Sequence, residues 1–122
     1  MSALPTESDV RKRIPVTTGC LDYFPLAIAY VAMISYLGNE KHNPGQPLHW
    51  AREKSADHAD CAGRHLLDRK TYDGGVLEAG QLAWRALANL QIALEQSTKA
   101  DVDIWAPIRK KDDSSSAAKP TR

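Results

Sequence analysis

The segment Tyr23–Leu37, YFPLAIAYVAMISYL, decides the fold, because it is apolar on nearly every side. Leu26, Met33 and Leu37 recur at helical spacing, and the pattern predicts a helix of about 23–37. Pro25 fits within the first helical turn, where its missing N–H costs little. A helix that is apolar all round must be covered on several sides. In so short a chain, this indicates contact with both its own subunit and another one.

Two further segments have helical periodicity, at about 55–69 and about 76–96. Ser55 is the predicted N-cap of the first of them, and Gly38 is the predicted end of the helix before it. A short C-terminal helical turn is expected before Ile108. The sequence therefore predicts an all-α helical bundle of three main helices and a short C-terminal helical turn, completed by oligomerisation.

The 122 residues fit one domain, which we place at 17–108. We expect residues 1–16 to form a flexible arm and the Lys-, Asp- and Ser-rich residues 109–122 to be disordered. The formal net charge of +1 gives no global field that would favour nucleic acid or a membrane surface. No signal peptide or zinc-type cysteine pair is present, and we expect a cytoplasmic protein.

The charged segment between the first two helices contains three acidic residues of interest, Glu40, Asp57 and Asp60. Asp57 and Asp60 are three residues apart and project on the same side of a helix. Two such carboxylates, with a third from a neighbouring element, suit a hard cation such as Mg²⁺ or Mn²⁺. The alternative is that this pair belongs to an ordinary solvated helix face, where such spacings are common.

Basic and aromatic residues are interleaved with these acids. Lys41, Arg52, Lys54 and Arg64, together with His42, form a set that would surround a polyphosphate. The alternative is that they are surface charges paired with nearby carboxylates. Trp50 is open to two interpretations as well, a lid over the core or a stacking surface for an aromatic ligand.

Histidines are also concentrated in this segment. His58 and His65 lie two helical turns apart with Cys61 between them, which superficially resembles a transition-metal site. A tetrahedral zinc site usually takes closer, converging ligands. A histidine hydrogen-bonded to a carboxylate or a phosphate is the favoured interpretation.

Three stretches together resemble a known family: TGCLDYFPLAIAYVA, GNEKHNPGQPLHWAREKSADHADCAGRHLLDR and AWRALANLQIALE. They resemble the phage-associated dATP/dGTP diphosphohydrolase N-terminal domain family, whose members are similar to MazG-like all-α nucleoside triphosphate pyrophosphohydrolases. The resemblance covers about Pro15–Glu95. It implies a phage or prophage protein of the bacterial cytoplasm, a homodimer or homotetramer, and Mg²⁺- or Mn²⁺-dependent cleavage of (d)NTPs, purine nucleotides above all, to monophosphate and pyrophosphate.

The resemblance also implies roles for particular residues. Glu40, Asp57 and Asp60 would be catalytic, and the metal would be held by these three and by Glu78, which stands where the family has a histidine. Glu40 lacks the second acid of the family's ExxE pair. The expected substrate-binding residues are Lys41, His42, Asn43, His49, Trp50, Arg52, Lys54, Arg64, His65 and Arg85.

Two other functions stay open at this point. The departures at Glu40 and Glu78 favour a non-catalytic module on the same scaffold, which would sequester nucleotides or bind a protein. A structural or assembly protein, held together by the helix of about 23–37, is the third possibility, and it predicts a solvated charged segment without a pocket.

Overall fold

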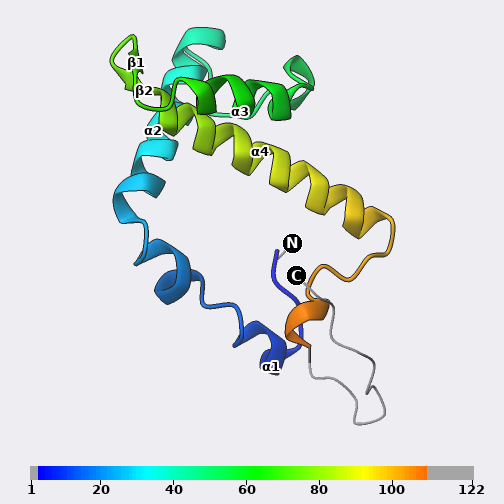
Figure 1. Ribbon diagram of the computed structural model, residues 1–122. Helices are drawn as coiled ribbons and strands as arrows, with labels where there is room; N and C mark the ends of the chain where they lie inside the picture. The colour runs from blue at the N-terminus through cyan, green and yellow to red at the C-terminus, as the bar shows by residue number, and fades with distance from the viewer. Residues whose placement is uncertain (1–2, 110–122) are drawn as a thin grey trace.

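The protein is described here by a computed structural model that covers residues 3–109, and the tail expected to be disordered lies almost wholly outside them. This part of the chain is mostly helical, which confirms the predicted all-α class (Figure 1). The predicted completion of the bundle by oligomerisation stays a prediction. In chain order, the elements are α1 (Ser8–Arg11), the π-helix η1 (Thr17–Leu21), α2 (Pro25–His42), the 3₁₀ turn η2 (Arg52–Lys54), α3 (His58–Leu67), β1 (Tyr72–Asp73), β2 (Val76–Leu77), α4 (Glu78–Lys99) and the 3₁₀ turn η3 (Ala106–Ile108).

Helix α2 is longer than predicted, because it continues through Gly38 and ends at His42. The prediction that Gly38 ends the helix is wrong. Asn43 is the last capping position, and its φ of −137° and ψ of 56° lie outside the helical region. Pro44 follows directly, and a residue before proline is sterically driven out of the α region. Proline, rather than glycine, therefore sets the end of the helix, and Glu40, Lys41 and His42 are helical.

Helix α3 begins later than predicted. Ser55 has an extended backbone, and its hydroxyl donates to Oδ1 of Asp57 at 3.0 Å. Asp57 occupies the position before the helix, and His58 is the first helical residue. The prediction that Ser55 caps this helix is therefore wrong, because its hydroxyl is used by a neighbouring carboxylate.

A small antiparallel hairpin, absent from the prediction, lies between α3 and α4. Tyr72 pairs with Leu77 and Asp73 with Val76. Gly74 and Gly75 both have positive φ, 57° and 83°. A two-residue turn with positive φ at both positions matches the twist of hairpin strands, and glycine adopts it without strain. The hairpin leads straight into α4, whose predicted start at about residue 76 moves to Glu78.

Helix α4 joins the structure together, since it packs against both α2 and α3. It approaches α2 closely at Gly80, where an added Cβ would lie 2.7 Å from the Tyr30 ring and 2.8 Å from Ile34. The Tyr30 hydroxyl accepts a hydrogen bond from the backbone N–H of Leu77 at 2.9 Å. One turn further on, the Trp84 indole N–H donates to the Ser35 hydroxyl at 2.8 Å. These contacts fix the middle of α2 on the N-terminal half of α4.

Beyond this contact α2 and α4 diverge, so that the ribbon outlines an open triangle (Figure 1). The third corner is formed by segments from the two ends of the chain. Arg109 pairs with Glu7 at 2.7 Å and with Asp103 at 2.5 Å, and Arg13 donates to the carbonyl of Ile108 at 2.9 Å. Part of the segment expected to be a flexible arm is thus helical and in contact with η3.

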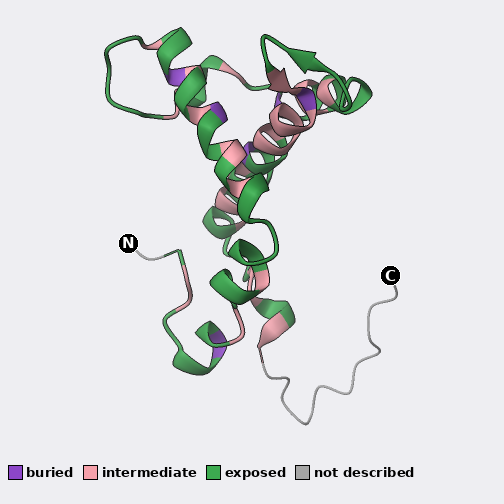
Figure 2. Ribbon diagram, turned by 90° about the vertical axis from the view of Figure 1, so that its left-hand side faces the viewer, coloured by how far each residue is buried: buried purple, intermediate pink, exposed green. Residues whose placement is uncertain are grey.

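Burial in this fold is sparse, as Figure 2 shows. Among the described residues, no side chain is completely inaccessible, and the buried apolar ones are Val10, Ile34 and Ala88. Leu26 on α2 is 86% exposed and Leu90 on α4 is 53% exposed. The apolar circumference of α2 is therefore covered on one side by its own chain and bare on the other. None of the helices between residues 3 and 109 combines the length and apolar character needed to cross a bilayer.

The close approach at Gly80 generates a stability prediction. Gly80→Ala should lower the free energy of unfolding by about 1–3 kcal/mol, because the added methyl overpacks the α2–α4 contact. Gly63 on α3 is the matched control, since a Cβ there meets nothing within 4 Å. Gly63→Ala should raise stability by about 0.5–1 kcal/mol through helix propensity alone. Urea unfolding measures both, and equal effects at the two positions would contradict the packing argument.

Candidate functional site

A cavity of about 1320 Å³ lies where α2, α3 and α4 meet. Its walls come from the C-terminal half of α2, the connection to α3, α3 itself, the hairpin and the first turns of α4. The continuation of α2 past Gly38 to His42 adds Asn39, Lys41 and His42 to the wall of this cavity. The cavity is thus built by the segment of about 38–69, which the sequence singles out, and by the polar side of α4.

Ten of the sequence-predicted site residues line this cavity. They come from separate segments of the chain: Lys41, His42, Asn43, His49, Trp50, Lys54, Asp57, His65, Glu78 and Arg85. The fold therefore gathers most of the expected substrate-binding set in one place.

Four predicted residues do not line it. Glu40 and Asp60 are exposed, on α2 and α3 respectively. Arg64 is exposed and pairs with Asp57 at 3.4 Å. Arg52 lines a second, smaller cavity instead. Two of the three proposed catalytic carboxylates are consequently outside the cavity in the single chain.

The two predicted carboxylates that line the cavity already have partners. Asp57 accepts from the Ser55 hydroxyl at 3.0 Å and from Arg64 at 3.4 Å, and these hydrogen bonds lower the pKa of its carboxyl. Glu78 is buried and lies 2.5 Å from Nδ1 of His65. Within residues 3–109, no three His, Cys, Asp or Glu side chains come together in a way that would hold a metal ion. The predicted metal set of Glu40, Asp57, Asp60 and Glu78 is not assembled by one chain.

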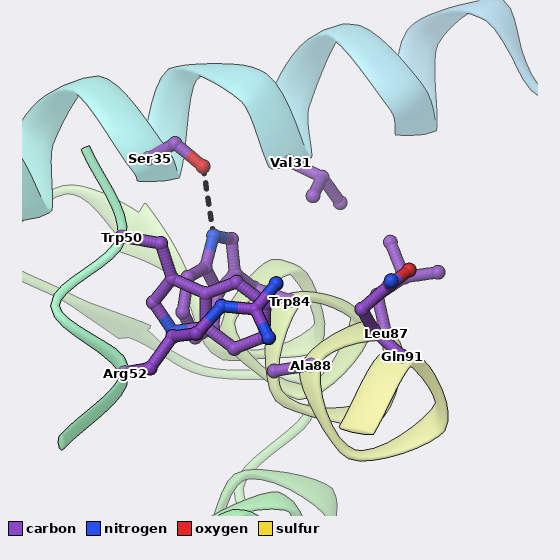
Figure 3. Close-up of a pocket in the computed structure, with 8 residues that line it drawn as sticks. All are labelled: Val31, Ser35, Trp50, Arg52, Trp84, Leu87, Ala88 and Gln91. Carbon is purple, nitrogen blue, oxygen red and sulfur yellow. Dashed lines mark hydrogen bonds between the residues drawn. The ribbon is translucent and has the colours of Figure 1, made fainter. Parts of the chain in front are cut away.

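Trp50 belongs to an aromatic cluster. Its ring lies edge-on to Trp84, with centroids 5.9 Å apart, and its centroid is 6.1 Å from that of His58. The Arg52 guanidinium covers one face of Trp50 at 4.2 Å (Figure 3). This arrangement fits the lid interpretation, because a ligand stacking on that face would first have to displace Arg52.

The smaller cavity, of about 460 Å³, lies beside this cluster and is lined mainly by apolar groups of α2 and α4 (Figure 3). Arg52 stands at its edge and pairs with Glu95 at 2.5 Å. Hydrogen bonds from Arg52 and Gln91 lower the pKa of Glu95 to about 2. Both side chains of this ion pair are substantially exposed, so its role is to orient Arg52 rather than to stabilise the fold.

Arg85 is held at the inner wall of the large cavity. One of its terminal nitrogens, Nη1, donates to the Ser55 hydroxyl at 2.9 Å and lies 3.0 Å from Nδ1 of His58. A guanidinium is always protonated and has no acceptor, so Nδ1 must accept. Burial, with a smaller effect of the Arg85 charge, lowers the pKa of His58, although the Asp57 charge opposes this. His58 is therefore neutral near pH 7 and carries its proton on Nε2.

Sequence reasoning missed two residues of the site, Asn39 and His58. The predicted helix end at Gly38 leaves Asn39 outside the helix, whereas it is buried in the last turns of α2. His58 is buried as well, and it is absent from the predicted substrate-binding and metal-binding residues. No local pattern predicts the burial of His58, because it depends on Trp84 and Arg85 of α4.

Comparison of the chain with protein families, with curated proteins and with solved structures found no match.

The lowered pKa of His58 predicts a pH dependence of stability. The unfolded chain takes up the proton near the ordinary pKa of about 6.5, while the folded chain resists it. The contribution of neutral His58 to the free energy of unfolding is then fully present above that pH, and it is lost as the pH drops below it. In His58→Gln, unfolding free energies between pH 7 and pH 5 should fall less steeply than in the wild type. His42→Gln, at an exposed position, serves as the control, and an unchanged slope in His58→Gln would contradict the assignment.

Proposed function

We propose that this chain binds nucleoside triphosphates in the cavity between α2, α3 and α4. The observation that carries the proposal is the set of three cations, Lys41, Lys54 and Arg85, on the wall of one large cavity. Among the ion pairs formed by residues 3–109, none involves these three side chains. Cations that face a cavity without carboxylate partners favour an anionic ligand such as a polyphosphate.

Size and wall chemistry support the same ligand class. Pockets for small molecules usually measure about 300–1,000 Å³ and combine apolar walls with a few polar groups. The cavity, at about 1320 Å³, has room for a base, a sugar and three phosphates. Trp50, Ile34 and Leu48 add apolar side chains to the wall that also carries the cations, so a heterocycle and a charged chain would each find matching groups.

Cleavage between the α- and β-phosphates is the activity that the resemblance to MazG-like pyrophosphohydrolases suggests, and we propose it for an oligomer of this chain. A divalent metal needs several oxygen ligands, which residues 3–109 of a single chain do not assemble. Glu40 and Asp60 are exposed, so further oxygen ligands for a metal beside them would have to come from a second copy of the chain. A bound metal would lower the pKa of a water and neutralise the phosphates. The cations of this chain would hold the leaving pyrophosphate.

A homo-oligomer is supported by the bare side of α2. Tyr23, Phe24 and Leu26 are exposed at its start, and Leu87 and Leu90 are exposed on the diverging half of α4. Monomeric proteins rarely leave large apolar surfaces in water. A second copy that inserts its own α2 between these two helices would bury them, as in a four-helix bundle.

Non-catalytic binding is the second candidate. The observation that favours it is that Asp57 and Glu78 are already committed to Arg64 and His65. A chain that only sequesters nucleotides would keep this arrangement and need no metal.

Binding is tested by titration calorimetry with dATP and dGTP. Lys54→Ala should weaken binding about tenfold, since a charge-assisted phosphate contact contributes roughly 1.5–3 kcal/mol. Lys70→Ala is the control, because Lys70 is exposed in the turn after α3 and does not line the cavity. Failure of the wild type to bind any nucleoside triphosphate would overturn the proposal, as would equal binding by the two variants.

Catalysis by an oligomer is tested by release of pyrophosphate with Mg²⁺ or Mn²⁺. Leu26→Lys should dissociate the oligomer, as measured by light scattering, and should lose pyrophosphate release while nucleotide binding persists. Asp60→Asn should keep the oligomer but reduce release at least a hundredfold, whereas Asp68→Asn should not. Full activity of Asp60→Asn would remove that residue from the mechanism. If the wild type binds nucleotides but releases no pyrophosphate, catalysis is contradicted and the non-catalytic sequestering function is supported.

A further inference from the structure

Two buried polar side-chain atoms in the described part of the chain lack a hydrogen-bond partner, Oδ1 of Asn39 and Nε2 of His58. Their side chains belong to residues only 7% and 4% exposed. Leaving a buried donor or acceptor unsatisfied costs about 1–3 kcal/mol. Such atoms are rare in folded proteins and need an explanation. Both residues line the same large cavity, which indicates a ligand as that explanation.

The two atoms have opposite hydrogen-bonding character. Nδ1 of His58 accepts from Arg85 at 3.0 Å, so the unsatisfied Nε2 carries the proton and is a donor. Nδ2 of Asn39 donates to the carbonyl of Gln46 at 3.0 Å, which orients the amide and leaves Oδ1 as an acceptor. Asn39 and His58, which both line the cavity, therefore hold one fixed donor and one fixed acceptor, each oriented by a contact behind it. A ligand reaches these buried atoms when the side chains that cover them move aside.

The surroundings of His58 match an aromatic ligand more closely than a phosphate. Its ring lies beside Trp50 and Trp84, with centroids 6.1 and 6.2 Å away. A neutral imidazole in an apolar cluster offers a directional hydrogen bond but no charge. Lys41 and Lys54 carry the positive charge that a phosphate needs, and the neutral imidazole of His58 does not. A heterocycle with its own donor and acceptor would satisfy both unpaired atoms.

We propose that His58 and Asn39 read the polar edge of the nucleobase and set base specificity. This inference rests on the proposed nucleotide binding. Nε2–H of His58 donates to a ring nitrogen or a carbonyl oxygen, and Oδ1 of Asn39 accepts from an exocyclic amino group or a ring N–H. Arg85 acts as a positioning residue, because its hydrogen bond fixes the tautomer of His58. A purine with no exocyclic group offers acceptors only and leaves Asn39 unsatisfied.

The experiment measures binding of four probes by titration calorimetry: dATP, dGTP, the triphosphate of unsubstituted purine riboside, and inorganic triphosphate. The wild type should bind its preferred purine nucleotide at least tenfold more tightly than the unsubstituted purine, because a site with committed polar groups rejects a ligand that cannot pair with them. In Asn39→Leu, this preference should shrink to within about twofold, while affinity for inorganic triphosphate stays unchanged. Asn89→Leu, at an exposed position of α4 outside the cavity, should retain the preference.

His58→Phe provides a second variant that keeps an aromatic ring but removes the donor. It should also lose the preference among purines without losing affinity for inorganic triphosphate. Wild-type affinities that do not distinguish the substituted from the unsubstituted purine overturn the inference, as does an undiminished preference in Asn39→Leu. Absence of binding by all four probes overturns the proposed nucleotide function, and this inference with it.

Discussion

The close contact between α2 and α4 is the constraint on which the rest of the structure depends. Gly80 allows the two helices to approach until the Tyr30 ring occupies the space of a missing side chain. The Tyr30 hydroxyl then reaches the backbone at Leu77, and Trp84 reaches Ser35. With α4 fixed in this way, its polar side, including Glu78 and Arg85, faces α3 across the large cavity. A single missing Cβ therefore sets the geometry of both the scaffold and the site.

The sequence predicted the helical class and the identity of the main segments, because the spacing of apolar residues shows which face of each helix must be buried. It failed at the boundaries, where two local signals compete. Gly38 is a common terminator, but its backbone is not driven out of the helix, whereas Asn43 is displaced by Pro44. Ser55 is a common cap, but Asp57 takes its hydroxyl. The hairpin is absent from the prediction, since two-residue strands have no periodicity to detect.

The site was predictable in part for a similar reason. Charged and aromatic residues concentrated in one segment indicate a site, and ten of the predicted residues do line one cavity. Which of them remain available depends on pairing across the fold, as with His65 and Glu78, which are joined by the packing of α3 on α4. The sequence does not show that Asn39 and His58 each hold an unsatisfied atom, since such an atom exists only once its surroundings are folded.

Helix α2 contributes both to the cavity and to the exposed apolar surface, and the two roles are coupled. Its C-terminal half forms a cavity wall with Asn39 and Lys41, while its N-terminal half is bare around Leu26. One continuous helix of 18 residues transmits any reorientation from one half to the other. On the proposed assembly, packing of a second copy against the bare half would fix the axis of α2 and hence the spacing between Asn39 and His58. Assembly and base reading would then be linked through one rigid element, and ligand affinity should rise with protein concentration over the range in which the oligomer forms.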